Sequence, residues 1–171
     1  SPLYLEALIG FEDRRFRQHP GVDPLALLRA AWQAARHGGI VSGGSTLTMQ
    51  VARLVDPVPR TARGKLRQIA RALQLEWRLS KDQILDLYLA LAPFGGNVEG
   101  VEAASWAYLG KSARQLSHAE AALLAALPQA PSRLRPDRHP RAARDARDKV
   151  LARLARFQVW SPERLREAAL E

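Results

Sequence analysis

The residues from Glu12 to Gly21 form the first group in the chain that could do chemistry. Glu12 and Asp13 are adjacent carboxylates at the end of an apolar stretch, and Phe16 and His19 follow shortly after. Neighbouring residues on a helix point in different directions, so the two carboxylates should have different tasks. A carboxylate that points into a cleft is suited to general acid–base chemistry. The alternative is a run of charges exposed to solvent. For a Glu-Asp pair on its own, this would be the preferred interpretation.

The second group is a glycine- and serine-containing segment, residues 43–50, with the sequence Gly-Gly-Ser-Thr-Leu-Thr-Met-Gln. It should open a helix at Ser45 and Thr46, where free backbone N–H groups and the helix dipole favour an anion. Thr46, Gln50 and Arg53 are spaced to share one face of that helix. This polar strip suits a phosphate-bearing or sugar substrate, and an ordinary helix N-cap is the alternative. A Walker A loop is excluded, because its lysine followed by serine or threonine is absent.

The third group is basic and lies at the start of a longer predicted helix. Arg60, Arg63, Lys65 and Arg67 cluster there, although positive charge at a helix start opposes the helix dipole. A negative charge that develops during a reaction, as on a pyrophosphate leaving group, would explain this local cost. Lys65 and Gln68 should share one helix face. For Arg63 and Arg67, a solvated basic face is a fair alternative.

The composition narrows the classes of partner. The 171-residue chain carries 26 Lys and Arg against 17 Asp and Glu, a formal charge of +9. This excess predicts nucleic acid, an acidic membrane surface or a phosphate-bearing substrate, with a merely soluble basic surface as the alternative. Cysteine is absent and the four histidines lack metal-ligand spacing, so a thiolate or histidine metal site is not predicted. No cofactor is expected, and a divalent cation such as Mg²⁺ would find no dedicated site.

The hydrophobic pattern predicts an all-α fold in one domain over residues 1–171. No window alternates with period two, and no Asn-Gly or Asp-Gly hairpin signal appears. Helices are predicted over residues 4–11, 46–55, 60–79, 98–109 and 141–157, and others begin at Asp23-Pro24, at capping boxes Ser80–Gln83 and Ser117–Glu120, and at Ser161-Pro162. Predicted loops cover residues 38–45, 93–97 and 128–140.

Two of these helices carry apolar stripes, and a third is apolar almost all round. The first stripe consists of Leu25, Leu28, Ala31, Trp32 and Ala35. The second, expected in the core, consists of Leu66, Ile69, Leu73 and Trp77. The helix that follows Ser80 has almost no polar face and should be buried. No run is long enough to span a bilayer, and the lack of an initiator methionine suggests a domain cut from a longer, membrane-anchored protein.

Taken together, these segments resemble the family 51 glycosyltransferases, the domain that precedes the transpeptidase in class A penicillin-binding proteins. The family's first motif, Glu-Asp-x-x-Phe-x-x-His-x-Gly, is complete from Glu12 to Gly21. The second, Gly-Gly-Ser-Thr-hydrophobic-Thr-Gln-Gln with a basic residue shortly after, matches residues 43–50 with Met49 for the first glutamine and Arg53 as the basic residue.

Later segments match the family in the same order. The fourth motif, Lys-x-x-Ile-Leu-x-x-Tyr-Leu-Asn, matches residues 81–90 with Ala90 for the asparagine. Residues 100–104, 108–112 and 121–132 are similar to the family's Gly-Ile-Glu-Ala-Ala, Tyr-Phe-Gly-Lys and Ala-Leu-Leu-Ala…Gln-Ala-Pro-Ser stretches. The third motif departs from Arg-Lys-x-x-Glu, because this chain has Gly64-Lys65-Leu66-Arg67-Gln68.

The resemblance implies a lysozyme-like helical fold with a smaller jaw-like lobe, and an enzyme that joins lipid II units into glycan strands. Glu12 would be the general base of an inverting displacement. Arg53, Arg60 and Lys65 would neutralise the departing undecaprenyl pyrophosphate, and Gln68 would take the place of the family's second glutamate. Because pyrophosphate is already a good leaving group, we expect Gln68→Glu to be tolerated. Substrate-binding roles would fall to Asp13, Phe16, His19, Ser45, Thr46 and Gln50.

The resemblance also implies the surroundings of the protein. Its partners would be lipid II, the growing glycan strand, the membrane surface and other cell-wall synthesis proteins, at the periplasmic face of the bacterial inner membrane, and nucleic acid is not expected. A membrane anchor and a transpeptidase domain would lie outside this chain.

Three alternatives remain open from the sequence. A lysozyme-like glycan-cleaving enzyme would also use a glutamate, but it would not need cations for a pyrophosphate. A helical nucleic-acid-binding module would concentrate its basic residues on one helix, whereas here they are spread from Arg14 to Arg166. A catalytically degenerate scaffold domain would account for the departures at Gly64, Gln68 and Ala90.

Overall fold

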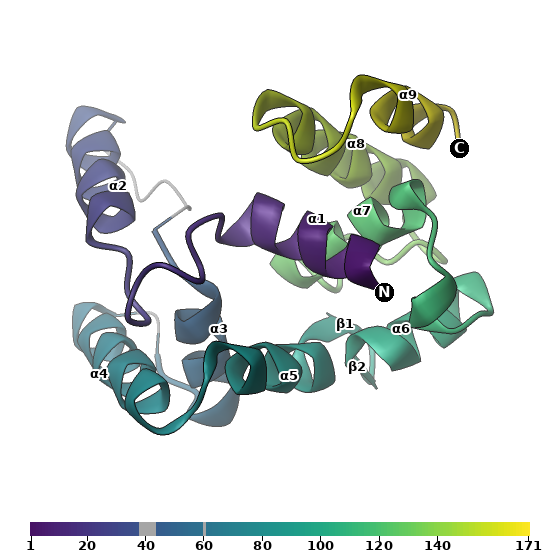
Figure 1. The fold of residues 1–171 in the computed structure, drawn as a ribbon. Coiled ribbons are helices and arrows are strands. Elements are labelled where there is room, and N and C mark those ends of the chain that lie inside the picture. Colours follow the sequence, from purple (N-terminus) through teal and green to yellow (C-terminus); the bar gives the residue numbers. More distant parts are fainter. Residues whose placement is uncertain (38–43, 60) are drawn as a thin grey trace. The chain divides into compact units, whose positions relative to one another are not determined.

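The computed structural model describes residues 1–37, 44–59 and 61–171, and it confirms the all-α class (Figure 1). The elements in chain order are α1 (Pro2–Glu12), α2 (Pro24–His37), α3 (Leu47–Val55), α4 (Ala62–Arg78), α5 (Lys81–Leu91), β1 (Pro93–Gly95), β2 (Val98–Glu99), α6 (Val101–Leu109), η1 (Ala113–Gln115), α7 (His118–Ala126), η2 (Leu127–Gln129), α8 (Pro140–Arg156) and α9 (Pro162–Leu170).

The chain folds into two compact units. The first unit consists of Ser1–Arg14 and Leu89–Glu171, and the second unit is Arg15–Tyr88. Each unit has its own helix–helix packing, α7 against α1 and α8 in the first and α3 against α4 in the second.

Helix α7 is the core of the first unit. It packs against α1, α6, α8, α9 and η2, and six of its nine residues, five alanines and Leu124, are buried. Its start is the predicted capping box: Ser117 Oγ accepts from the backbone N–H of Glu120 at 3.2 Å, and Glu120 Oε2 accepts from the backbone N–H of Ser117 at 2.7 Å. Because alanine side chains are short, neighbouring helices approach α7 closely. The prediction of a central core helix here is confirmed.

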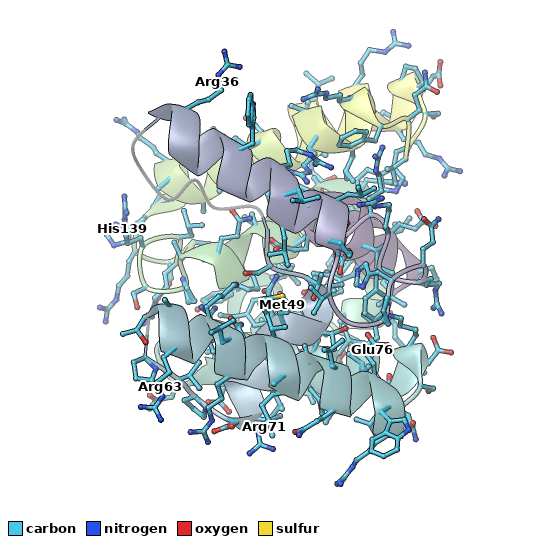
Figure 2. All side chains as sticks on the ribbon, turned by 90° about the vertical axis from the view of Figure 1, so that its left-hand side faces the viewer. Arg36, Met49, Arg63, Arg71, Glu76 and His139 are labelled. Atoms are coloured by element: carbon cyan, nitrogen blue, oxygen red, sulfur yellow. The ribbon has the colours of Figure 1, made fainter. Side chains whose placement is uncertain are left out.

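A small hydrophobic cluster of the second unit lies between α3 and α4. Met49 and Ala52 of α3 and Ala72 of α4 are fully or almost fully buried, and Met49 is labelled in Figure 2. Val22, Ile69 and Leu75 pack around them. The short side chains of Ala52 and Ala72 let the backbones of α3 and α4 lie close together at this cluster.

The predicted core stripe of residues 66–77 is wrong for three of its four members. The exposed fractions of Leu66, Leu73 and Trp77 are 68%, 46% and 84%, and only Ile69 packs against the core. Helix α4 instead buries Gly64, Gln68 and Ala72. The stripe on α2 is likewise exposed at Leu25, Leu28 and Trp32. Helix α5 buries Ile84, Leu85 and Tyr88, whereas its remaining leucines are half-buried.

The segment after α5 also differs from the prediction. Strands β1 and β2 form an antiparallel pair in which Pro93 is opposite Glu99 and Gly95 opposite Val98, where a loop and then a helix from Val98 were predicted. The next helix, α6, begins only at Val101. Glycines explain the difference, because Gly95 and Gly100 have φ of +103° and +82°, values that a helix does not contain.

Candidate active site

Glu12 is the last residue of α1 and belongs to the first unit. The helix ends there because Asp13 leaves the helical conformation, with φ −152°, while its backbone N–H donates to the carbonyl of Ile9 at 3.1 Å. Glu12 is half-buried, and the Nε2 of Gln129 donates a hydrogen bond to its Oε1 at 2.9 Å. Burial, and then the negative charge of Glu12, raise the pKa of the buried hydroxyl of Tyr4 on the same helix. Glu12 is therefore held at a helix end, beside a neutral donor.

The two adjacent carboxylates have different surroundings, as their spacing predicts. Asp13 is only 6% exposed, whereas Glu12 is half-buried. The guanidinium of Arg14, the next residue, lies over the ring of Phe157 at 3.8 Å from its centroid. The buried position of Asp13 suits bracing of the chain after α1, and its predicted contact with substrate stays a prediction.

A partly buried ion pair connects three of the sequence motifs within the second unit. Lys81 Nζ donates to Glu76 Oε1 at 2.6 Å and to the backbone carbonyl of His19 at 2.7 Å. It also lies 4.6 Å from the centroid of the Phe16 ring. Thr48 Oγ1 donates to the same Glu76 oxygen at 2.6 Å. Phe16 and His19 are buried, so this network gives both a structural task beside their predicted binding role.

The loop before α3 is fixed by Thr46. Its Oγ1 accepts from the backbone N–H of Met49 at 3.1 Å, as an N-cap does, and donates to the carbonyl of Gly21 at 2.5 Å. Gly21 has φ +86°, and an added Cβ would lie 2.7 Å from Glu76 Cγ. Thr46 thus joins the end of the first motif to the start of α3.

Lys65 is a cation with polar but uncharged contacts. Its Nζ donates to Ser45 Oγ at 2.6 Å and to Gln68 Oε1 at 3.3 Å. Burial, and then the positive charge of Arg53, lower the pKa of Lys65. In the part of the chain that the structure describes, no carboxylate forms an ion pair with Lys65 or Arg53. An anion bound beside these side chains would relieve their repulsion.

The other basic residues of α4 are less suited to binding an anion beside Lys65. Arg67 and Arg71 both bind the carboxylate of Asp56, at 3.0 Å and 2.9 Å. Arg63 is exposed and points away from Met49 on the outer side of α4, as does Arg71 (Figure 2). The solvated alternative therefore fits Arg63, and Arg67 is held by an ion pair.

Gln68 has a structural contact that the sequence did not predict. It is 6% exposed, and its Nε2 donates to the backbone carbonyl of Met49 at 2.6 Å while its Oε1 accepts from Lys65. Lys65 and Gln68 therefore share a helix face, as predicted. A glutamate at this position would lose the donor to Met49, which counts against the expectation that Gln68→Glu is tolerated.

For the remaining predicted site residues, the structure gives burial alone or no description. Gln50 is half-buried and Arg53 is exposed in the last turn of α3. Arg60 and Gly43 lie outside the described residues. Within residues 1–37, 44–59 and 61–171, no group of three or more His, Cys, Asp or Glu could hold a metal ion. Among the same residues, no helix is both long and apolar enough to cross a membrane.

Comparison with known proteins decides the family. The family model named transglycosylase matches residues 1–155. The chain belongs to the transglycosylase family. Its class of activity is therefore that of a peptidoglycan glycosyltransferase domain, as in class A penicillin-binding proteins.

Curated relatives of this transglycosylase domain are penicillin-binding proteins. The form of its second and third motifs predicts a likeness to penicillin-binding protein 1C. The Escherichia coli K12 protein of that name is 64% identical over 171 residues, which is 100% of this chain and 22% of the relative. Penicillin-binding protein 1A of Aquifex aeolicus is 42% identical over 165 residues, 96% of this chain and 23% of the relative. The chain thus spans about a fifth of the length of these relatives.

A solved structure supports the fold of the transglycosylase domain. The crystal structure of penicillin-binding protein 1A from Haemophilus influenzae matches with a TM-score of 0.52 at 26% identity, over 73% of this chain and 16% of that one.

Sequence reasoning missed two groups in this transglycosylase domain. Gln129 lies in the Gln-Ala-Pro-Ser stretch that carries part of the resemblance, yet nothing local connects it with Glu12. Lys81 and Glu76 are five residues apart across a helix break. Their opposite charges are a signal for an ion pair, but not for its burial.

Proposed function

We propose that this domain polymerises lipid II into glycan strands, with Glu12 as the general base. The carboxylate of Glu12 takes the proton of the acceptor's sugar 4-hydroxyl. The acceptor oxygen forms a bond to C1 of the donor's terminal sugar, the bond from C1 to the pyrophosphate oxygen breaks, and undecaprenyl pyrophosphate leaves with the electron pair. The configuration at C1 is inverted.

The observation that carries this proposal is the state of Lys65 in a transglycosylase domain. Its ammonium is partly desolvated, lies near the like charge of Arg53, and has no carboxylate partner among the residues described. Cations so placed favour an anionic ligand, and they stabilise most where negative charge develops. A leaving pyrophosphate develops such charge, so we assign Arg53, Lys65 and, from the sequence, Arg60 to it.

The alternatives explain these cations less well. A glycan-cleaving enzyme protonates a neutral sugar leaving group and needs no cation pair there. A nucleic-acid-binding surface would need accessible charge, whereas Arg67 and Arg71 are paired with Asp56. The departures from the family pattern do not require a degenerate site, because Gln68 has two satisfied hydrogen bonds.

Exposed apolar side chains support a membrane surface as a partner. Within the second unit, the exposed large apolar residues are Leu25, Leu28, Trp32, Val55, Leu66, Leu73 and Trp77. Exposed apolar side chains on a protein of charge +9 suit an anionic bilayer surface. We propose that the domain acts at the periplasmic face of the bacterial inner membrane, as part of a longer protein with an anchor and a transpeptidase domain, and that other cell-wall synthesis proteins bind it there.

The test is incubation of the protein with labelled lipid II, followed by gel analysis of polymer and measurement of released undecaprenyl pyrophosphate. Arg53→Ala and Lys65→Ala should each lower turnover by about tenfold or more, with a smaller effect on acceptor binding. Arg63→Ala, which removes an exposed charge from the outer side of α4, is the matched control and should leave turnover unchanged. Normal polymerisation by both Arg53→Ala and Lys65→Ala would refute the leaving-group assignment. A wild-type protein that binds lipid II without forming polymer would support the degenerate scaffold.

A further inference from the structure

Gln129 lies beside the carboxylate of Glu12, although 117 residues separate the two in the sequence. Glu12 ends α1 and Gln129 ends η2, which continues directly from α7. Helix α1 packs against α7 in the first unit, and this packing brings the two side chains together. The Nε2 of Gln129 then donates to Oε1 of Glu12 at 2.9 Å.

A hydrogen-bond donor should stabilise and order the Glu12 side chain, because its carboxylate lies at a helix end. The C-terminal end of a helix carries a partial negative charge, which disfavours a carboxylate there. The last turn of α1 contains no basic residue to offset this. A glutamate side chain also has three rotatable bonds, and ordering them costs entropy unless a contact holds them. Gln129 is exposed, and its amide supplies both a favourable contact and a preferred direction for the carboxylate.

The element that carries Gln129 is well supported. Leu127 at the start of η2 is fully buried, and the backbone N–H of Ala130 donates to the carbonyl of Leu127 at 3.2 Å. The backbone N–H of Arg133 in turn donates to the carbonyl of Ala130 at 2.9 Å. Pro128 restricts the backbone directly before Gln129. The amide is therefore presented from a segment with little freedom to move.

An amide is the suitable donor for a carboxylate that must act as a base. It donates N–H hydrogen bonds without carrying charge, and it has no proton to exchange with the carboxyl group in this pH range. A lysine or arginine at this place would form an ion pair and stabilise the carboxylate so strongly that its basicity would fall.

We propose that Gln129 is a positioning residue for Glu12, whose side-chain amide orients the carboxylate toward the acceptor hydroxyl. The inference rests on the proposed function, in which Glu12 is the base. It predicts that the loss of the amide affects the rate of transfer and not the binding of lipid II.

The test compares Gln129→Met with the wild-type protein in steady-state polymerisation of lipid II. Methionine keeps the length of the side chain but has no N–H to donate. We expect kcat to fall about tenfold, with KM and Tm unchanged. Gln129→Lys, which keeps a donor but adds a charge, should also lower kcat. Gln115→Met, at an exposed glutamine of η1 in the same unit, is the matched control and should behave as the wild type.

A double variant shows whether Gln129 acts through Glu12. If it does, Gln129→Met should lower turnover no further in a Glu12→Gln background. An equal loss in both backgrounds would assign Gln129 a role independent of Glu12 and overturn the inference, as would wild-type turnover by Gln129→Met while Glu12→Gln is inactive. Wild-type turnover by Glu12→Gln would instead refute the proposed function itself.

Discussion

Removal of the Lys81 ammonium should destabilise the protein far more than removal of a cation from an exposed ion pair. Lys81 Nζ lies 2.6 Å from Glu76 Oε1 and 2.7 Å from the carbonyl oxygen of His19. The side chains of Lys81 and Glu76 are only 19% and 11% exposed. In Lys81→Met the aliphatic part of the side chain is largely retained, but the carboxylate of Glu76 keeps only Thr48 as a partner among these contacts.

The magnitude follows from this burial. Breaking a buried ion pair by removing one partner costs roughly 3–5 kcal/mol, because the other charge stays without compensation. Since this pair is only partly buried and Thr48 still donates to Glu76, we expect no more than the lower end, about 3 kcal/mol. For a protein of this size that corresponds to a fall in Tm of about 6–12 °C. Addition of Glu76→Gln should recover part of this loss, because the unpaired charge is then gone.

An exposed ion pair in the second unit provides the control for Lys81→Met. Arg17 and Asp82 form an ion pair at 2.8 Å, with side chains that are 58% and 74% exposed. Water screens such a pair, so Arg17→Met should cost less than about 1 kcal/mol. The assay is urea denaturation followed by circular dichroism, on the wild type, Arg17→Met, Lys81→Met and the double variant. A free energy of unfolding for Lys81→Met within about 0.5 kcal/mol of the wild type would refute the account of this network.

Three further predictions concern the loop before α3 and its contact with α4. Gln68→Glu removes the donor to the buried carbonyl of Met49 and should destabilise by about 1–3 kcal/mol, measured by thermal unfolding; wild-type stability would show that the amide is not needed. The pKa of Lys65 is lowered from 10.5 by burial and by the charge of Arg53, so its charged form is disfavoured in the folded state. The resulting destabilisation is full at neutral pH and is relieved as pH rises toward 10.5, so the wild type should gain stability relative to Lys65→Met over that range; a constant difference between the two would show that folding does not lower this pKa. Thr46→Ala removes an N-cap and should cost about 1–2 kcal/mol in denaturant, whereas Thr46→Ser should restore most of that loss.

Local signals explain which parts of the fold were predictable. The capping box at Ser117 and Glu120 and the glycine that ends α6 at Gly110 act within one turn, so short sequence windows contain them. The hairpin from Pro93 to Glu99 depends on glycines at positive φ, which the sequence allows but does not specify.

The apolar stripes could not be placed from the sequence because periodicity finds an apolar face but not what covers it. Helix α4 packs through Gly64, Gln68 and Ala72, and leaves Leu66 and Trp77 exposed. An interface of small residues gives almost no periodic signal.

In the candidate site, too, local motifs were predictable and contacts between distant segments were not. Glu12 and Thr46 stand in local motifs, and the sequence was enough to single them out. The contact of Gln129 with Glu12 and that of Gln68 with the carbonyl of Met49 arise from packing between distant segments. No local pattern predicts a contact of this kind.

The most direct test of the central claim is the rate of lipid II polymerisation by Glu12→Gln beside that of Glu6→Gln. Both substitutions replace a carboxylate of α1 by an amide, and Glu6 accepts a hydrogen bond from Trp160 Nε1 at 2.7 Å that an amide oxygen can still accept. With Glu12 as the base, Glu12→Gln should lose roughly 10²–10⁴-fold in turnover while its Tm stays that of the wild type, and Glu6→Gln should polymerise normally. Turnover by Glu12→Gln equal to that of Glu6→Gln would contradict the assignment of Glu12 as the catalytic base.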